Sequence, residues 1–278
     1  MVFVLVMFIS RCQMFVVIRV SCFVLAFVVV TPLSSGPASG GSFLLEPGSG
    51  QVIQSTTIMT SRLSYDARGA LAADTPYRKI ESSLWTEFGL TRNVTLIANP
   101  VLRDVAVQTE VGTIAGRGLG SMELGARWRL FDYQGDAVSF QATTRVAARS
   151  DPVLSLENRP RTELRLGYGF PALVNGKAGF ADSSLTWVKR HEAGRDEVRH
   201  EMTIGWWQRP TRMVLIQYYT TFYPVSGLRH AARQDKVLTS TVYKLNDSWS
   251  FQLGSFFTRG GHLTRRERGT VMALWRRF

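Results

Sequence analysis

Cysteine is missing from most of this chain, and its absence limits the chemistry that the protein can carry. Only Cys12 and Cys22 are cysteines, and both lie within the first forty residues. The rest of the chain therefore forms no disulfide and no thiolate metal site. A cysteine-free body is typical of a protein that is exported through an oxidising periplasm.

Long apolar runs are also scarce. After residue 33, no segment approaches the ~18 consecutive apolar residues that a membrane-spanning helix needs, although 45% of the chain is hydrophobic. This excludes a helical-bundle membrane protein. The formal net charge is +12, but the cations are spread along the chain with carboxylates among them. We therefore expect no nucleic-acid partner.

Recognisable catalytic elements are absent as well. There is no G-x-S-x-G element, and the four histidines are scattered along the chain. We therefore predict no catalytic residues, no metal and no cofactor. The rival hypothesis is a lipid hydrolase, in which His200 would act with a serine such as Ser155, Ser226 or Ser240.

The first forty residues resemble a secretory signal peptide. Residues 1–33 are apolar apart from Arg11 and Arg19, and residues 34–40 are small. Translation can also start at Met14, and cleavage is expected near residues 38–40. The alternative is an uncleaved membrane helix over residues 15–33. Residues 41–50 are glycine-rich, and we expect them to form a flexible periplasmic lead-in to a domain over residues 51–278.

Alternation of apolar and charged residues dominates that domain. Met122, Leu124 and Trp128 fall on one parity, whereas Glu123 and Arg127 fall on the other. Since side chains of a strand alternate between its two faces, one face is apolar and the other is charged. The pattern recurs at about ten residues per strand, as in transmembrane barrels. It predicts strands over residues 51–62, 77–88, 94–106, 121–131, 137–148, 161–170, 177–188, 198–208, 212–222, 236–245, 249–258 and 268–278.

The connections between these segments alternate between short and long. The short ones are rich in turn formers, and the long ones are expected over residues 63–76, 107–120, 149–160, 189–197, 223–235 and 259–267. In outer-membrane barrels, short turns face the periplasm and long loops face outside. The sequence therefore predicts an all-β, transmembrane up-and-down antiparallel β-barrel of about twelve strands. We expect a monomer in the bacterial outer membrane with both termini periplasmic.

The charged parity would line the interior of the barrel. Because a buried charge is costly unless it is paired, we expect a network of cross-strand ion pairs. The alternative is a conduit whose arginines favour anionic solutes. The lumen-facing charged residues are Glu81, Glu87, Glu123, Arg127, Arg129, Arg145, Glu163, Arg165, Arg199 and Glu201, with Asp182 as a further candidate.

The last strand points to two groups of partners. The chain ends at Phe278, with Leu274 and Met272 on alternate positions. This ending resembles the C-terminal signal of outer-membrane proteins, although Arg276 departs from it. We expect the barrel-assembly machinery to engage the strand that ends in Phe278. Outer-membrane lipid and lipopolysaccharide would surround the barrel.

Residues 87–96, E-F-G-L-T-R-N-V-T-L, resemble the turn of a family of outer-membrane barrels. Some members are assigned to the meta-pathway of phenol degradation and others to transport. Residues 47–53 and 118–123 also resemble the family, which implies a monomeric barrel of Gram-negative bacteria that takes up small or hydrophobic compounds. In this interpretation Gly89 adopts a positive φ in a tight hairpin. We predict a passive channel for a small anionic or hydrophobic solute; the alternative is a structural or adhesive barrel without conductance.

Overall fold

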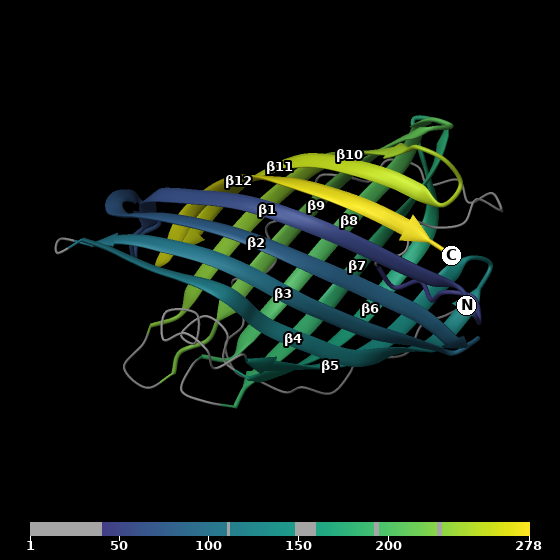
Figure 1. The fold of residues 1–278 in the computed structure, drawn as a ribbon, viewed down its shortest axis with the longest axis horizontal. Helices are drawn as coiled ribbons and strands as arrows, with labels where there is room; N and C mark the ends of the chain where they lie inside the picture. Colours follow the sequence, from purple (N-terminus) through teal and green to yellow (C-terminus); the bar gives the residue numbers. More distant parts are fainter. Residues whose placement is uncertain (1–40, 110–111, 148–159, 192–194, 227–229) are drawn as a thin grey trace, which may run out of the picture.

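A computed structural model describes residues 41–109, 112–147, 160–191, 195–226 and 230–278, which form a closed barrel of twelve antiparallel strands (Figure 1). Each strand pairs with its neighbours in sequence, and β1 pairs with β12 to close the barrel. The predicted fold class is therefore confirmed. No described helix is long and apolar enough to cross a membrane. The expected leader over residues 1–40 lies outside the described residues.

Every predicted strand segment corresponds to a strand of the structure. The strands are β1 (Gly50–Tyr65), β2 (Leu71–Thr91), β3 (Val94–Thr109), β4 (Gly112–Tyr133), β5 (Asp136–Ala147), β6 (Arg161–Val174), β7 (Lys177–Arg190), β8 (Glu197–Arg209), β9 (Arg212–Tyr223), β10 (Ala232–Lys244), β11 (Trp249–His262) and β12 (Thr264–Arg277).

Three of the expected long loops are wrong in length. Only residues 66–70, 110–111 and 263 separate the strands there, because β2, β4 and β12 begin well before the predicted boundaries. These extensions mix small, polar and apolar residues without regular alternation, so the period-two signal that marks a half-buried strand is lost. The short turns include Gln134-Gly135 and Asn175-Gly176, whose φ angles are all positive, as a type I′ hairpin turn requires.

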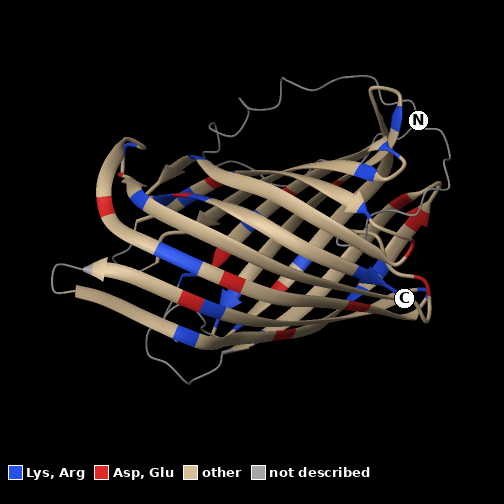
Figure 2. Ribbon diagram, turned by 45° about the horizontal axis from the view of Figure 1, so that its top comes forward, with Lys and Arg blue, Asp and Glu red and all other residues tan. Residues whose placement is uncertain are grey.

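The exposed face of the barrel wall is apolar and the enclosed face is polar. Leu124 is 50% exposed and Leu166 is 52% exposed, whereas Arg127 on the same strand as Leu124 is 1% exposed. Lys, Arg, Asp and Glu are interspersed along the strands (Figure 2). This polarity is the reverse of that of a soluble β-sandwich and matches a barrel that is surrounded by lipid.

Both ends of the barrel domain meet at one end of the barrel. The amide of Gly50 donates to the carbonyl of Phe278 over 2.7 Å, and the amide of Phe278 donates back over 3.0 Å. The turns at Gln134-Gly135 and Asn175-Gly176 lie at this same end, because β1 starts there and consecutive strands are antiparallel. We call it the termini end, and the opposite one the loop end.

Candidate functional site: the lumen and its lead-in segment

Residues 41–49, the lead-in segment, enter the barrel at the termini end. Ser42 is buried, and its amide donates to Asp182 Oδ2 over 2.6 Å. The ring of Phe43 meets that of Phe180 edge-on, with 6.2 Å between ring centroids. The expectation of a flexible periplasmic lead-in does not describe this arrangement, because the segment is tied to a strand more than a hundred residues away.

Arg127 joins the lead-in segment to the barrel wall. Its Nη1 donates to the Phe43 carbonyl over 3.0 Å, and its Nη2 donates to Glu87 Oε1 over 2.8 Å. Its Nε donates to Gln141 Oε1 over 3.1 Å. Arg127 and Glu87 are both almost completely shielded from solvent. A single guanidinium thus links β4, β2, β5 and the lead-in segment.

Glycines on the inner wall make room for the lead-in segment. A Cβ on Gly89 would lie 2.2 Å from the Glu46 carbonyl oxygen, and one on Gly167 would lie 2.4 Å from Ser42 Oγ. A Cβ on Gly169 would lie 2.8 Å from the Phe43 ring. The interpretation of Gly89 as a positive-φ turn residue is wrong, because its φ is not among the positive ones. Gly89 is required by close backbone approach instead.

The lead-in segment leaves the lumen along β2 and β3. The amide of Leu45 donates to Thr95 Oγ1 over 3.2 Å. The amide of Gly48 then donates to the Gly89 carbonyl over 2.8 Å, and the amide of Gly89 donates to the Ser49 carbonyl over 2.9 Å. The E-F-G-L-T stretch therefore serves two purposes: Glu87 pairs with Arg127, and Gly89 seats the lead-in segment.

Ion pairs line the rest of the inner wall. Arg145 Nη2 lies 2.9 Å from Glu123 Oε2, and Arg199 Nη1 lies 3.3 Å from Glu163 Oε2. These pairs join neighbouring or nearby strands, as expected for charges that are taken out of bulk water. The remaining predicted lumen residues also lie in pairs: Arg165 with Glu201 at 3.3 Å and with Asp182 at 3.8 Å, and Glu81 with Arg103 at 2.6 Å.

Arg129 differs from the other predicted lumen residues in its position, because it lies at the edge of the barrel. It pairs with Asp132 beside the turn at the termini end, and both side chains are partly exposed. A bulge between Arg129 and Phe131 interrupts the pairing of β4 with β5 there. Parity correctly assigns a face to Arg129, but it does not show how far along the barrel axis the residue lies.

Several charged residues of the lumen were not among the predicted set. Arg103 pairs with Glu81, and Glu197 pairs with Arg199 at 2.5 Å and also with Arg190. The predicted loop over residues 189–197 includes Glu197, but this residue is the first of β8. Arg103 on β3 is the direct cross-strand partner of Glu81 on β2, so both side chains lie on the same face of the wall. Parity was therefore a usable signal that Arg103 faces inward.

Solvent reaches the carboxylates of the lumen unequally. Glu87 and Arg127, beside the lead-in segment, have side chains that are 0% and 1% exposed. Farther from the termini, Glu81 and Glu201 are 29% and 27% exposed. The lead-in segment therefore shields the Glu87–Arg127 pair at the termini end, whereas beyond it Glu81 and Glu201 are partly exposed and Glu197, at 2%, is not.

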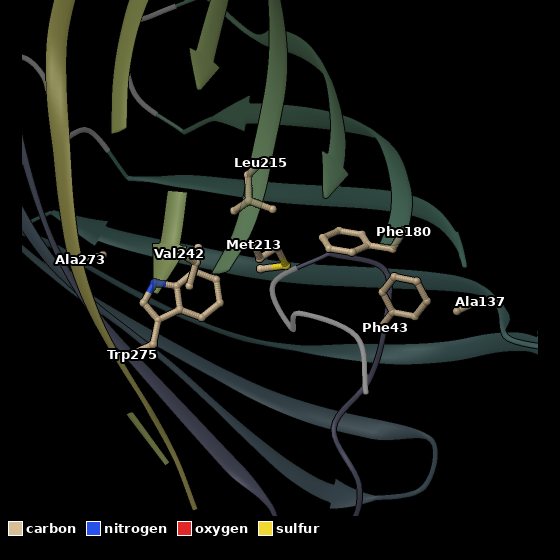
Figure 3. Packing of buried hydrophobic residues seen from close by; sticks show 8 residues of the cluster. All are labelled: Phe43, Ala137, Phe180, Met213, Leu215, Val242, Ala273 and Trp275. Carbon is tan, nitrogen blue, oxygen red and sulfur yellow. The ribbon is translucent and has the colours of Figure 1, made fainter. Parts of the chain in front are cut away.

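An apolar layer lies beside the lead-in segment. Figure 3 shows Phe43 near Phe180, with Met213, Leu215 and Trp275 in the same layer. These side chains come from β7, β9 and β12, so they surround the interior on several sides. Trp275 Nε1 donates to Gln252 Oε1 over 3.1 Å, which satisfies the indole without exposing it. These side chains are buried, so the layer packs the interior beside the lead-in segment.

His200 has a serine neighbour, but it is none of the three suggested by the sequence. Its Nε2 lies 3.0 Å from Ser183 Oγ. Ser240 lies on the inner face, where it accepts a hydrogen bond from Gln252, and Ser155 falls outside the described residues. Among the described residues, no carboxylate is hydrogen-bonded to His200. A catalytic base at His200 would therefore lack the acidic residue that orients the imidazole in a catalytic triad. Ser183 also lies within a paired strand. The backbone amides of that strand donate to neighbouring strands and are not free to stabilise an oxyanion.

No protein-family model matches the chain, and no curated protein is similar to it in sequence. Among solved structures, the COG4313 outer membrane channel from Pseudomonas putida F1 is similar, with a TM-score of 0.66 and 14% identity over 88% of this chain and 100% of that one. The translocator domain of autotransporter NalP from Neisseria meningitidis gives a TM-score of 0.49 and 9% identity over 84% and 90% of the two chains. The NanC porin gives 0.47 and 8% over 79% and 98%.

The first of these likenesses shows the fold of this chain, which is that of an outer-membrane β-barrel. The resemblance of residues 87–96 to the barrels assigned to the phenol meta-pathway is not matched by a family model and stays a prediction.

Proposed function

We propose that this protein is a passive outer-membrane channel for small solutes, gated or narrowed at its periplasmic end by the lead-in segment. The loop end would face outside and the termini end would face the periplasm, as in other barrels with an even number of strands. The observation that carries the proposal is the unequal access of solvent, which reaches Glu81 and Glu201 but not Glu87.

The side chains that line the lumen indicate which class of solute the channel would favour. The arginines of the predicted network that face the lumen lie beside carboxylates, so little uncompensated positive charge remains among them to select anions. Beside the lead-in segment, the buried side chains of Phe180, Met213 and Trp275 would line the path of a solute once the segment moved aside. We therefore favour small hydrophobic or neutral compounds over anions. A width of twelve strands lies between filled eight-stranded barrels and open sixteen-stranded porins.

Planar-bilayer recording of the refolded protein tests this proposal. The wild type should show small or infrequent openings with weak ion selectivity. Phe43→Ala should enlarge or multiply the openings, because the Phe43 ring packs edge-on against Phe180 and so helps to hold the lead-in segment in the lumen. Tyr243→Ala is the matched control, since its exposed ring lies outside the lead-in contacts.

A barrel without conductance is the second candidate, and the sealed Glu87–Arg127 pair favours it. The same recordings separate the two candidates. Openings in the wild type that grow in the lead-in variant support a channel. If both proteins are silent while they migrate as folded barrels, the channel proposal fails and the structural interpretation stands.

A further inference from the structure

Unpaired arginines gather on the outer face of the barrel toward the loop end. Each of them is exposed, and they come from β1, β2, β4, β11 and β12. Figure 2 shows Lys and Arg on strands toward the end away from the C-terminus. We call this group the arginine belt: Arg62, Arg78, Arg117, Arg259, Arg266 and Arg268.

The strand register brings the members of the arginine belt close together. Thr60 on β1 pairs with Arg78 on one side and with Arg268 on the other. The two arginines are therefore separated by two strand spacings, or about 10 Å. Arg62 is the extra residue of a bulge immediately beyond Thr60, and Arg266 pairs with the residue that follows the bulge. Four cations thus share one small area of three adjacent strands.

Carboxylates do not neutralise this area. Within the described part of the chain, none of the six arginines forms an ion pair or a side-chain hydrogen bond. Asp104 is the cross-strand neighbour of Arg117, but it lies beyond ion-pair distance. Asp74 pairs with Arg265 instead, at 3.6 Å. On the inner face of the same barrel, Arg103, Arg127 and Arg145 lie against carboxylates, so the two faces differ in how their arginines are paired.

The arginine belt lies at the border of the exposed apolar surface. From Arg268 toward the termini end, the outward positions of β12 are Thr270, Met272 and Leu274, and the last two are exposed apolar side chains. On β2, Leu84 follows Arg78 on the same side. Arginines at such a border stand at the level of lipid headgroups, with their stems along the apolar surface.

We infer that the arginine belt binds the phosphate groups of lipopolysaccharide in the outer leaflet. A guanidinium donates two parallel hydrogen bonds to a phosphate, and several of them on a rigid wall can hold a lipid that carries more than one phosphate. This inference rests on the outer-membrane placement proposed above, with the loop end outside. It does not depend on whether the barrel conducts.

Binding of bisphosphorylated lipid A to the full-length refolded protein in neutral detergent tests the inference. The variant Arg78→Gln/Arg268→Gln should bind about 30-fold more weakly than the wild type, since each arginine near an anionic lipid contributes about fivefold. The control is Arg92→Gln/Arg209→Gln, which removes the same charge from exposed sites at the termini end. The control should bind within twofold of the wild type.

Further lipids identify the source of the phosphate. Monophosphorylated lipid A should bind more weakly than the bisphosphorylated form, and phosphatidylglycerol vesicles of equal phosphate content more weakly still. Equal weakening by both double variants would overturn the inference, because net charge alone would then explain binding. Equal affinity for phosphatidylglycerol would overturn it too. Heat-modifiable migration on a gel verifies that each variant is folded, and conductance, measured separately, tests only the channel proposal.

Discussion

Arg127→Ala provides the sharpest test of how the lumen is held together. The substitution removes the cation that pairs with Glu87 and the donor to the Phe43 carbonyl. Glu87 is 0% exposed, and its second oxygen, Oε2, has no hydrogen-bond partner in the described part of the protein. The substitution would therefore leave a carboxylate buried without a counter-charge.

Breaking a buried ion pair by removing one partner costs about 3–5 kcal/mol. We expect Arg127→Ala to lower the free energy of unfolding by that amount, measured by urea titration of the protein refolded in lipid vesicles. Glu87→Gln in the same background should recover a large part of the loss, because the unpaired charge disappears. The lead-in segment should also become accessible to protease, since one of its anchors is lost.

Arg129→Ala is the matched control for this experiment. It removes the same side chain two residues away on β4, from a partly exposed pair with Asp132. Exposed pairs contribute about 0–1 kcal/mol, so the loss should be small. Equal losses at Arg127 and Arg129, or no recovery from Glu87→Gln, would refute the account of a sealed lumen at the termini end.

Three further predictions concern the wall and the lead-in segment. Leu124→Arg, on the exposed apolar face, should destabilise the barrel by about 2–4 kcal/mol in vesicles, whereas Leu124→Ala should have a much smaller effect; equal effects would mean that the face is misassigned. Gly89→Val should cost about 1–3 kcal/mol by overpacking against the Glu46 carbonyl, while Leu90→Val, at an exposed neighbour, should not. The wild-type protein should migrate differently on a gel before and after boiling, and identical migration would contradict a stable membrane barrel.

Period-two alternation was sufficient to locate the strands and assign their faces. Leu124 and Leu166 are outward, and Arg127 and Glu163 are inward, as their parity requires. The signal is strong because lipid and lumen demand opposite side chains at every step along a strand. It fades toward the loop end, where β2, β4 and β12 extend into segments that the alternation predicts to be loops.

The interior arrangement could not be predicted in the same way. The lead-in segment appears flexible by composition, yet its partner Asp182 lies on β7, and such a long-range contact leaves no local pattern. Gly89 was correctly singled out but for the wrong reason, since a glycine that avoids a clash and a glycine that turns the chain are identical in sequence. Parity likewise assigns Arg129 to the inner face, but it does not show how far along the barrel axis the residue lies.

Single-cysteine scanning of β4 tests the inside-out polarity most directly, because residues 41–278 contain no cysteine. Each position from Ser121 to Leu130 except Gly125 and Arg127 would carry one spin label in refolded protein, and its collision rate with lipid-soluble oxygen would be measured. The account predicts high rates at positions 122, 124, 126, 128 and 130 and low rates between them. The opposite alternation, or equal rates throughout, would contradict a wall with lipid on its apolar side.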